Sequence, residues 1–341
     1  MRVTRHACAG ALAALIAAGC GGESPGTTPA PAGAAANAPS GIGRIERIDP
    51  AFDALVAPSA AIEKVAGGFK FTEGPLWRPD GTLWFSDLPG NVVRSLTRDG
   101  KVTVLIENSG GAPKPAPEGF IGANGLAEAP DGSVWMVQHA ARRIVRVGPD
   151  RTLTPVVSDF EGKRFNSPND LVFAKDGALY FTDPPYGLAK QDDDPAKELT
   201  FNGVYRLANG RVQALVRDLN RPNGLAFSPD FKILYVNNSD AAKNLVMRYD
   251  VAADGTLVNG RVLADLTSKV EGLADGLKVD AKGNIYTTGP GGVWVLSPEG
   301  KHLGTIQSPE IPANCGWGDD GKTLYMTATT GVYRVKTLIG R

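Results

Sequence analysis

Residues 169–183 read Asn-Asp-Leu-Val-Phe-Ala-Lys-Asp-Gly-Ala-Leu-Tyr-Phe-Thr-Asp. The stretch contains two hydrophobic runs, Leu171–Phe173 and Leu179–Phe181, on either side of the turn dipeptide Asp176-Gly177. An Asp-Gly turn between runs that are rich in aromatic and β-branched residues is typical of a β-hairpin. The stretch therefore predicts a strand, a tight turn and a returning strand.

The same strand–turn–strand motif occurs six times along the chain, and each copy begins with an acidic or amide residue. These leading residues are Glu73, Asn124, Asn169, Asn223, Asp275 and Asn314. They are separated by 51, 45, 54, 52 and 39 residues, and spacings of this size are typical of the blades of a β-propeller. We therefore expect an all-β fold, a six-bladed β-propeller with four-stranded blades.

The runs between copies complete this prediction. Alternating stretches such as Arg143–Val147 and Gly203–Leu207 supply the third and fourth strands of each blade. A TIM barrel would need long amphipathic helices between its strands, and the sequence has no such pattern. Residues 51–63 read as a short helix or a closing segment. In the sixth copy the turn comes one residue earlier than in the other five, so the register of Asn314 is offset.

Composition is that of an ordinary globular protein. The chain has 341 residues, of which 42% are hydrophobic, and its 36 basic residues balance 36 acidic ones. A nucleic-acid partner would need a basic surface, so we expect none. The 42 glycines and 25 prolines indicate many turns, as a fold of short strands requires.

The first residues resemble an export signal. Arg2 and Arg5 precede a short apolar run that ends at Cys20, and small residues before a cysteine are typical of a bacterial lipoprotein signal. We expect residues 1–19 to be a lipoprotein signal peptide and residues 20–41 to be the lipidated Cys20 and a flexible Gly/Ala/Pro linker. Residues 42–341 then form the six-bladed propeller domain. The protein would be exported and anchored in the periplasm by this lipid, with plain secretion as the alternative.

Cysteine use fits an exported protein without disulfides. Once Cys8 and Cys20 are assigned to the signal and the lipid, only Cys315 remains. The sequence therefore offers neither an intramolecular disulfide nor a cysteine-based zinc site. We expect the protein to be a monomer.

The leading residues predict a metal site. The first strand of each propeller blade lines the central channel, so equivalent positions meet near the axis. Carboxylate and amide oxygens without cysteine or histidine are ligands for a hard cation. We expect one divalent cation, calcium first, with magnesium, manganese or zinc as alternatives. Two other interpretations remain open: Asn-Gly and Asp-Gly are common turn dipeptides, and asparagine side chains could merely tie the blades together.

The second strand of each copy returns toward the same face. Its end should bring five residues to the mouth of the channel, namely Asp87, His139, Asp183, Asn237 and Thr327. The rigid stretch Asp183-Pro184-Pro185-Tyr186-Gly187 then provides an aromatic pocket wall. His139 is the one histidine with a functional place in this scheme, although a buried structural histidine would give the same pattern.

Five motifs resemble those of the gluconolactonase, senescence-marker-protein and luciferin-regenerating-enzyme superfamily. They are Phe71–Trp77, Asn166–Leu171, Thr182–Gly187, Arg221–Leu225 and Asp275-Gly276. The resemblance covers nearly all of residues 60–336, and the Asp183–Gly187 run is most similar to bacterial gluconolactonases.

The resemblance implies a six-bladed propeller with one catalytic divalent ion. Its ligands would be Glu73, Asn169, Asn223 and Asp275, and Asn124 would contact the substrate beside the ion. Asp183 and Tyr186 would also line the substrate site. The animal members have an arginine two positions before this asparagine, whereas this chain has Gly122 there.

The expected activity is hydrolysis of a sugar lactone. The cation would polarise the lactone carbonyl, and water would attack it with Asp275 as first and His139 as second candidate for the general base. No Gly-x-Ser-x-Gly nucleophile motif is present, which disfavours a covalent serine route. Two alternative functions remain: a phosphotriesterase that uses the same metal site, and a binding propeller without enzymatic activity.

Overall fold

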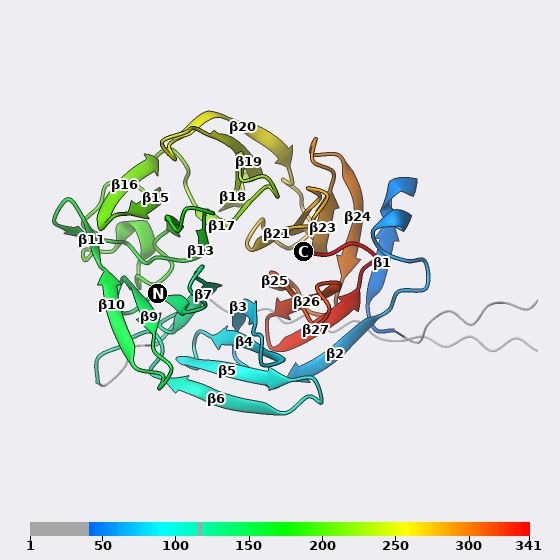
Figure 1. Cartoon of the computed structure of the whole chain (residues 1–341), viewed down its shortest axis with the longest axis horizontal. Helices are drawn as coiled ribbons and strands as arrows, with labels where there is room; N and C mark the ends of the chain where they lie inside the picture. Colours follow the sequence, from blue (N-terminus) through cyan, green and yellow to red (C-terminus); the bar gives the residue numbers. More distant parts are fainter. Residues whose placement is uncertain (1–40, 115–117) are drawn as a thin grey trace, which may run out of the picture. The chain divides into compact units, whose positions relative to one another are not determined.

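A computed structural model describes residues 41–114 and 118–341, and it confirms the predicted six-bladed β-propeller. Figure 1 looks along the propeller axis, with the first strand of each blade nearest the centre. In four of the blades the strands run in sequence order from the centre outward, whereas in the other two a strand from the N-terminal part of the described chain is outermost; neighbouring strands are antiparallel. The regular helical elements are two short 3-10 segments, η1 (Pro50–Ala54) and η2 (Gln191–Asp193).

Blades 1 to 3 occupy the first half of the ring. Blade 1 is β3 (Thr72–Trp77), β4 (Thr82–Asp87), β5 (Val92–Thr97) and β6 (Val102–Glu107). Blade 2 is β7 (Ala123–Glu128), β8 (Val134–Gln138), β9 (Arg143–Val147) and β10 (Leu153–Val157). Blade 3 is β13 (Leu171–Phe173), β14 (Leu179–Asp183), β15 (Gly203–Ala208) and β16 (Arg211–Val216). A small hairpin, β11 (Asp159–Phe160) and β12 (Lys163–Arg164), joins blades 2 and 3.

Blades 4 to 6 complete the ring. Blade 4 is β17 (Pro222–Phe227), β18 (Ile233–Asp240), β19 (Lys243–Val251) and β20 (Leu257–Asp265). Blade 5 begins with β21 (Leu277–Val279), β22 (Ile285–Gly289), β23 (Gly292–Leu296) and β24 (His302–Gln307). Blade 6 begins with β25 (Pro312–Gly318), β26 (Thr323–Ala328) and β27 (Gly331–Lys336).

The N-terminal part of the described chain closes the ring. Strand β2 (Ile62–Gly67) pairs with β27 as the fourth strand of blade 6, and β1 (Arg44–Arg47) pairs with β24 as a fifth strand of blade 5. The expected short helix or closing segment at residues 51–63 is thus η1 followed by the start of β2. Blade 5 departs from the expected four strands because it carries this additional one.

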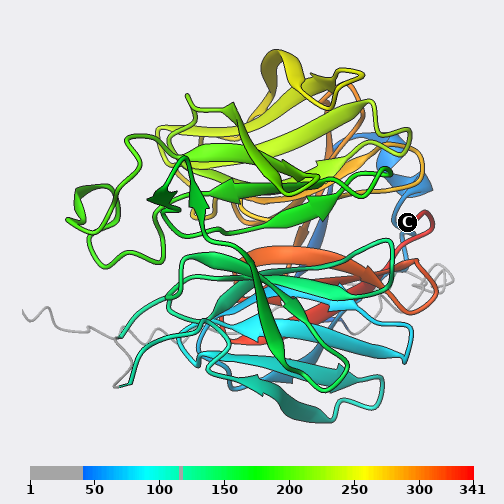
Figure 2. The same cartoon turned by 60° about the vertical axis from the view of Figure 1, so that its left-hand side comes forward.

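The hydrophobic core lies in layers between neighbouring blades. One cluster joins Trp84 and Val93 of blade 1 to Leu126 and Met136 of blade 2. Another joins blades 5 and 6 to residues that precede β2, including Phe52 and Leu55, and to Ile62 at the start of β2. Figure 2 shows the blades side by side as stacked, twisted sheets. Because each layer is shared by two blades, the blades form a single folded body in which the first strands are held around the axis.

The predicted signal peptide at residues 1–19, the lipidated Cys20 and almost all of the linker at residues 20–41 lie outside the described residues. Within residues 41–114 and 118–341, no helix is long and apolar enough to cross a membrane.

Candidate active site at the centre of the ring

β-bulges aim the leading residues at the axis. The pairing of β3 with β4 shifts between Glu73 and Leu76, and the same irregularity occurs in β7 and β17. A bulge interrupts the two-residue alternation of a strand and redirects a side chain. In blades 3 and 5 the regular strand begins only after the leading residue, at Leu171 and Leu277.

The six leading residues lie together in one ring, and hydrogen bonds join five of them. Asn124 Nδ2 donates to Asn169 Oδ1 at 2.6 Å, and Asn169 Nδ2 donates to Asn223 Oδ1. On the other side, Asn314 Nδ2 donates to Glu73 Oε2 at 2.8 Å. Asp275 lies beside both groups, because its backbone oxygen accepts the N–H of Gly224 at 2.9 Å and the charge of Glu73 helps to raise the pKa of its carboxyl group. The turn of the sixth copy is offset by one residue in the sequence, but the side chain of Asn314 still reaches the same centre as the other five.

The two acids of this ring, Glu73 and Asp275, both have raised pKa values. Burial, followed by the charge of Asp170, raises the pKa of Glu73 to about 7. Burial and the charges of Glu73 and Asp170 raise the pKa of Asp275 well above its usual range. Nearby carboxyl groups of low solvent exposure are costly to ionise together, so a cation beside them would be stabilising.

The residues present suit a divalent cation. Asp170 Oδ2 is buried beneath the ring and has no hydrogen-bond partner. The amide oxygens of Asn169 and Asn223 each accept one hydrogen bond and keep a second lone pair. Within the described ranges, no group of three or more His, Cys, Asp or Glu side chains forms a metal cluster, so such a site would depend on these amide oxygens.

His139 lies beside the ring as a neutral imidazole. Its Nδ1 is 3.1 Å from the carbonyl oxygen of Phe120 and must donate to it, because a carbonyl can only accept. Its Nε2 therefore carries the lone pair and lies 3.4 Å from Asn124 Nδ2. Burial lowers the pKa of His139 to about 4, so its imidazole group is uncharged at neutral pH.

Tyr186 and Asp183 have different surroundings. Burial, followed by the charge of Asp275, raises the pKa of the Tyr186 hydroxyl, so this side chain lies near the ring, and its contact with substrate stays a prediction. The carboxylate of Asp183 instead accepts the backbone N–H groups of Asn166 and Ser167, each at 2.8 Å. Its described contacts are therefore with the segment that leads to Asn169, and a contact with substrate stays a prediction.

Asp87 plays a similar part in blade 1. Its carboxylate accepts the backbone N–H groups of Lys70 and Phe71 and pairs with Arg94 at 3.0 Å. Asn237 donates to the carbonyl oxygen of Asp275 at 2.7 Å, and Thr327 donates to that of Asn314 at 3.3 Å. These residues, which the sequence placed at the mouth of the channel, thus hydrogen-bond the backbone at or near the leading residues.

Three charged residues near the ring were missed in the sequence. Asp170 occupies the position that holds glycine in four of the other copies, Lys278 lies three residues after Asp275, and Arg221 lies two residues before Asn223. Arg221 pairs with Asp192 and donates to Gln191 at 3.4 Å, and so fastens the loop that carries Tyr186. Comparing equivalent positions of the six copies would have singled out each of these residues.

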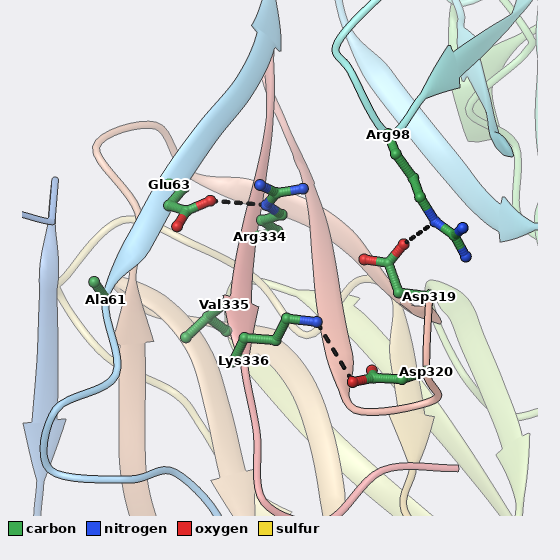
Figure 3. Close-up of a pocket in the computed structure, with 8 residues that line it drawn as sticks. All are labelled: Ala61, Glu63, Arg98, Asp319, Asp320, Arg334, Val335 and Lys336. Carbon is green, nitrogen blue, oxygen red and sulfur yellow. Dashed lines mark hydrogen bonds and ion pairs between the residues drawn. The ribbon is translucent and has the colours of Figure 1, made fainter. Parts of the chain in front are cut away.

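Cavities lie on both sides of the ring and on the outer surface. One of about 490 Å³ follows the channel beyond the ring and is lined by Asp170, Lys278 and the first strands of the blades. A second, of about 530 Å³, lies between blades 3 and 4 and includes Arg221 and Ser239. The crevice of about 470 Å³ in Figure 3 lies on the outer side of blade 6, where Arg334 pairs with Glu63 and Lys336 with Asp320. It contains no residue of the ring.

Comparisons with known proteins agree with this geometry. Residues 71–330 match the model of the SMP-30/Gluconolactonase/LRE-like region. A gluconolactonase of Zymomonas mobilis is 41% identical over 311 residues, which is 87% of each chain. The solved structure of a gluconolactonase from Xanthomonas campestris is 31% identical with a TM-score of 0.75, covering 86% of this chain and 94% of that one. A regucalcin from Agrobacterium tumefaciens, described as a calcium-binding protein, shares the fold at 19% identity, with a TM-score of 0.62 and coverage of 81% and 96%.

Proposed function

The chain belongs to the SMP-30/gluconolactonase/LRE-like family and is a lactone-hydrolysing enzyme, and we propose that it opens a sugar lactone with the help of one divalent cation. The cation would be held by Glu73, Asn169, Asn223 and Asp275. The observation that carries this proposal is the ring of oxygen ligands, in which Asn169 Nδ2 donates to Asn223 Oδ1 and Asn314 Nδ2 donates to the buried carboxyl group of Glu73 at 2.8 Å.

Calcium is our first choice for the ion. The four proposed ligands are two carboxylates and two amides, and calcium prefers such hard oxygen donors in a flexible arrangement. Magnesium, manganese and zinc remain alternatives that a binding assay separates. When bound, the cation would polarise the lactone carbonyl and stabilise negative charge on its oxygen.

The residues of the chain would supply the proton transfers. Water adds to the carbonyl carbon and loses a proton. The C–O bond of the lactone ring then breaks, and the departing oxygen takes up a proton to become a hydroxyl. Asp275 is our first candidate to accept the proton of the water. His139 is the second, because its unprotonated Nε2 accepts only a long contact of 3.4 Å from Asn124 Nδ2. Asn124 and Tyr186 would contact the hydroxyl groups of the substrate.

Activity and metal dependence can be tested together. The purified protein should hydrolyse D-glucono-1,5-lactone, lose this activity in a chelator and recover it with calcium or another divalent cation. A panel that includes a phosphotriester tests the rival activity at the same ring. Preferred turnover of the phosphotriester would assign the site to that chemistry instead.

The ligand assignment has its own test. Glu73→Gln and Asp275→Asn together should reduce kcat/KM at least about 100-fold, because removing groups that stabilise transition-state charge costs about 2.7 kcal/mol or more. Glu63→Gln and Asp320→Asn are matched controls, since both residues form ion pairs on the outer surface. Full activity in the ring variant would refute the metal mechanism.

We also propose that the protein is exported and held in the periplasm by a lipid on Cys20, and that it acts as a monomer. The small residues before Cys20 support the first proposal. Mass spectrometry of the mature N-terminus would detect the lipid, and an unmodified N-terminus after residue 19 would indicate plain secretion. Light scattering of the soluble domain measures the oligomeric state.

A further inference from the structure

Lys278 is a polar exception on the wall of the channel. The residues three positions after the six leading residues all line the cavity of about 490 Å³. Five of them are apolar, and the sixth is the lysine of blade 5; they are Leu76, Ala127, Val172, Ala226, Lys278 and Trp317. A charged side chain at one of six equivalent, partly buried positions costs desolvation free energy, so it requires a partner.

The partner of Lys278 is the sixth leading residue. Its Nζ donates to the carbonyl oxygen of Leu277 at 3.0 Å and lies 3.5 Å from Asn314 Oδ1. The backbone N–H of Cys315 also donates to Asn314 Oδ1, at 2.8 Å. The oxygen of Asn314 is thereby engaged on the side of Lys278, and its Nδ2 is directed to Glu73. Asn314 thus presents its N–H group, rather than its oxygen, to the carboxyl group of Glu73.

Asp170 supplies the opposite charge on the same wall. It follows Asn169 directly, where four other copies have Gly74, Gly125, Gly224 and Gly276. Its Oδ2 is buried without a partner, and it lines the same cavity as Lys278. Farther along the cavity, Glu128 pairs with Arg78, and Asp280 accepts from Asn284 at 2.8 Å. The charges that face the ring are therefore three carboxylates and one ammonium group.

The balance of these groups matches a divalent ion. Glu73, Asp170 and Asp275 contribute −3 when ionised, and Lys278 contributes +1, which leaves −2. A dication restores neutrality in this buried place, whereas a trivalent cation leaves one uncompensated charge.

We propose that Lys278 is a positioning residue that turns the oxygen of Asn314 away from the cation and sets the charge of the ring to suit a divalent ion. This inference rests on the proposed cation site and deepens it, because it assigns the ring's discrimination between divalent and trivalent cations to one side chain. Without Lys278, the ring carries −3, and the oxygen of Asn314 is held by the N–H of Cys315 alone, which makes its rotation toward the centre easier.

Ion binding tests the inference without measuring catalysis. Calcium and terbium are titrated into the full-length protein, with calorimetry for calcium and luminescence for terbium. Lys278→Met should increase the affinity for terbium relative to calcium at least about tenfold, and Lys278→Arg should keep the wild-type ratio. Lys282→Met is the matched control, since Lys282 is an exposed residue of the same blade. Lys278→Gln replaces the methionine variant if that variant does not fold.

A second charge change sharpens the test. Asp170→Asn should weaken both ions, and Asp170→Asn combined with Lys278→Met restores −2 and should return the ratio of affinities toward the wild-type value. An unchanged ratio in Lys278→Met, or a loss of binding for both ions, would overturn the inference while the cation site stands. If the wild-type protein binds neither ion, the cation site fails and this inference fails with it.

Discussion

At the scale of single residues, the ring separates side chains that bear charge from side chains that hold the backbone. Glu73 and Asp275 have raised pKa values because burial and like charge disfavour ionisation. Asp87 is just as buried but accepts two backbone N–H groups and pairs with Arg94. The same chemical group can therefore carry charge at the site or hold the backbone, depending on whether N–H groups and an arginine surround it.

Asp183 offers a test of the second role through pH. Burial raises the pKa of its carboxyl group to about 7, above the value of 3.8 expected in the unfolded chain. Between these values the folded state holds a proton that the unfolded state has lost, so the contribution of Asp183 to the free energy of unfolding falls as pH rises. Asp183→Asn should remove this contribution, and urea unfolding from pH 4 to 8 should give a flatter profile than the wild-type protein.

The same variant should be less stable at every pH. An asparagine has one acceptor oxygen, so either the Asn166 or the Ser167 N–H group loses its partner, at a cost of about 1–3 kcal/mol. Asp176→Asn, in an exposed turn, is the control. Parallel pH profiles for Asp183→Asn and the wild-type protein would contradict a raised pKa for Asp183.

Residue roles were predictable from the sequence to the extent that they follow the repeat. Glu73, Asn124, Asn169, Asn223 and Asp275 stand at one register, and hydrogen bonds join the three asparagines in the structure. The contacts of Asp183 and Lys278 were not predictable, because they depend on which backbone atoms lie within reach across the fold. A repeat identifies equivalent positions, whereas the partner of a side chain is set by packing.

At the scale of elements, the glycine after a leading residue lets neighbouring blades approach at the centre. A Cβ atom on Gly224 would lie 2.3 Å from the carbonyl oxygen of Asp275, and one on Gly276 would lie 2.1 Å from the side chain of Asn314. The N–H group of Gly224 donates to that same Asp275 oxygen at 2.9 Å. The glycines of the repeat, which resemble turn residues in the sequence, here serve close contact between blades.

Gly224→Ala should therefore disturb both stability and the site. The added methyl group displaces the Asp275 backbone, so we expect a loss of about 1–3 kcal/mol in the free energy of unfolding together with weaker cation binding. Gly177→Ala is the control: its turn has open space but a φ of +84°, so it should cost about 1–2 kcal/mol and leave binding intact. Denaturant titrations and calcium titrations measure the two effects, and normal cation binding in Gly224→Ala would contradict this account.

At the scale of the whole molecule, closure of the ring depends on contacts far apart in the sequence. The repeat indicates six blades, but blade 6 contains only three consecutive strands, β25 to β27, and takes its outer strand from residues 62–67. The sequence suggested a closing segment near residues 51–63 without giving its partner. Short strands pair with any complementary edge in principle, so the partner is decided by which edge remains open when the other blades have formed.

The N-terminal segment should therefore govern stability. Residues 41–67 supply η1, the two closing strands, and core side chains that include Phe52, Leu55 and Ile62. The N–H groups of Ile48 and Asp49 donate to Leu303, and that of Leu338 donates to Leu55, so the segment joins blade 5 to the C-terminal residues. Its removal also exposes the edges of β24 and β27.

Three shortened chains test this dependence by thermal unfolding. A chain that begins at residue 41 keeps both closing strands and should retain the wild-type Tm. One that begins at residue 60 loses β1, η1 and Phe52 and should be destabilised by about 3–5 kcal/mol, the usual cost of removing a buried aromatic side chain. One that begins at residue 68 also loses β2 and should have a Tm lower by at least about 10 °C, or aggregate through the open edge of β27. Equal Tm values for the chains beginning at residues 41 and 68 would mean that the six blades close without this strand, and that the shared hydrophobic layers alone hold the ring.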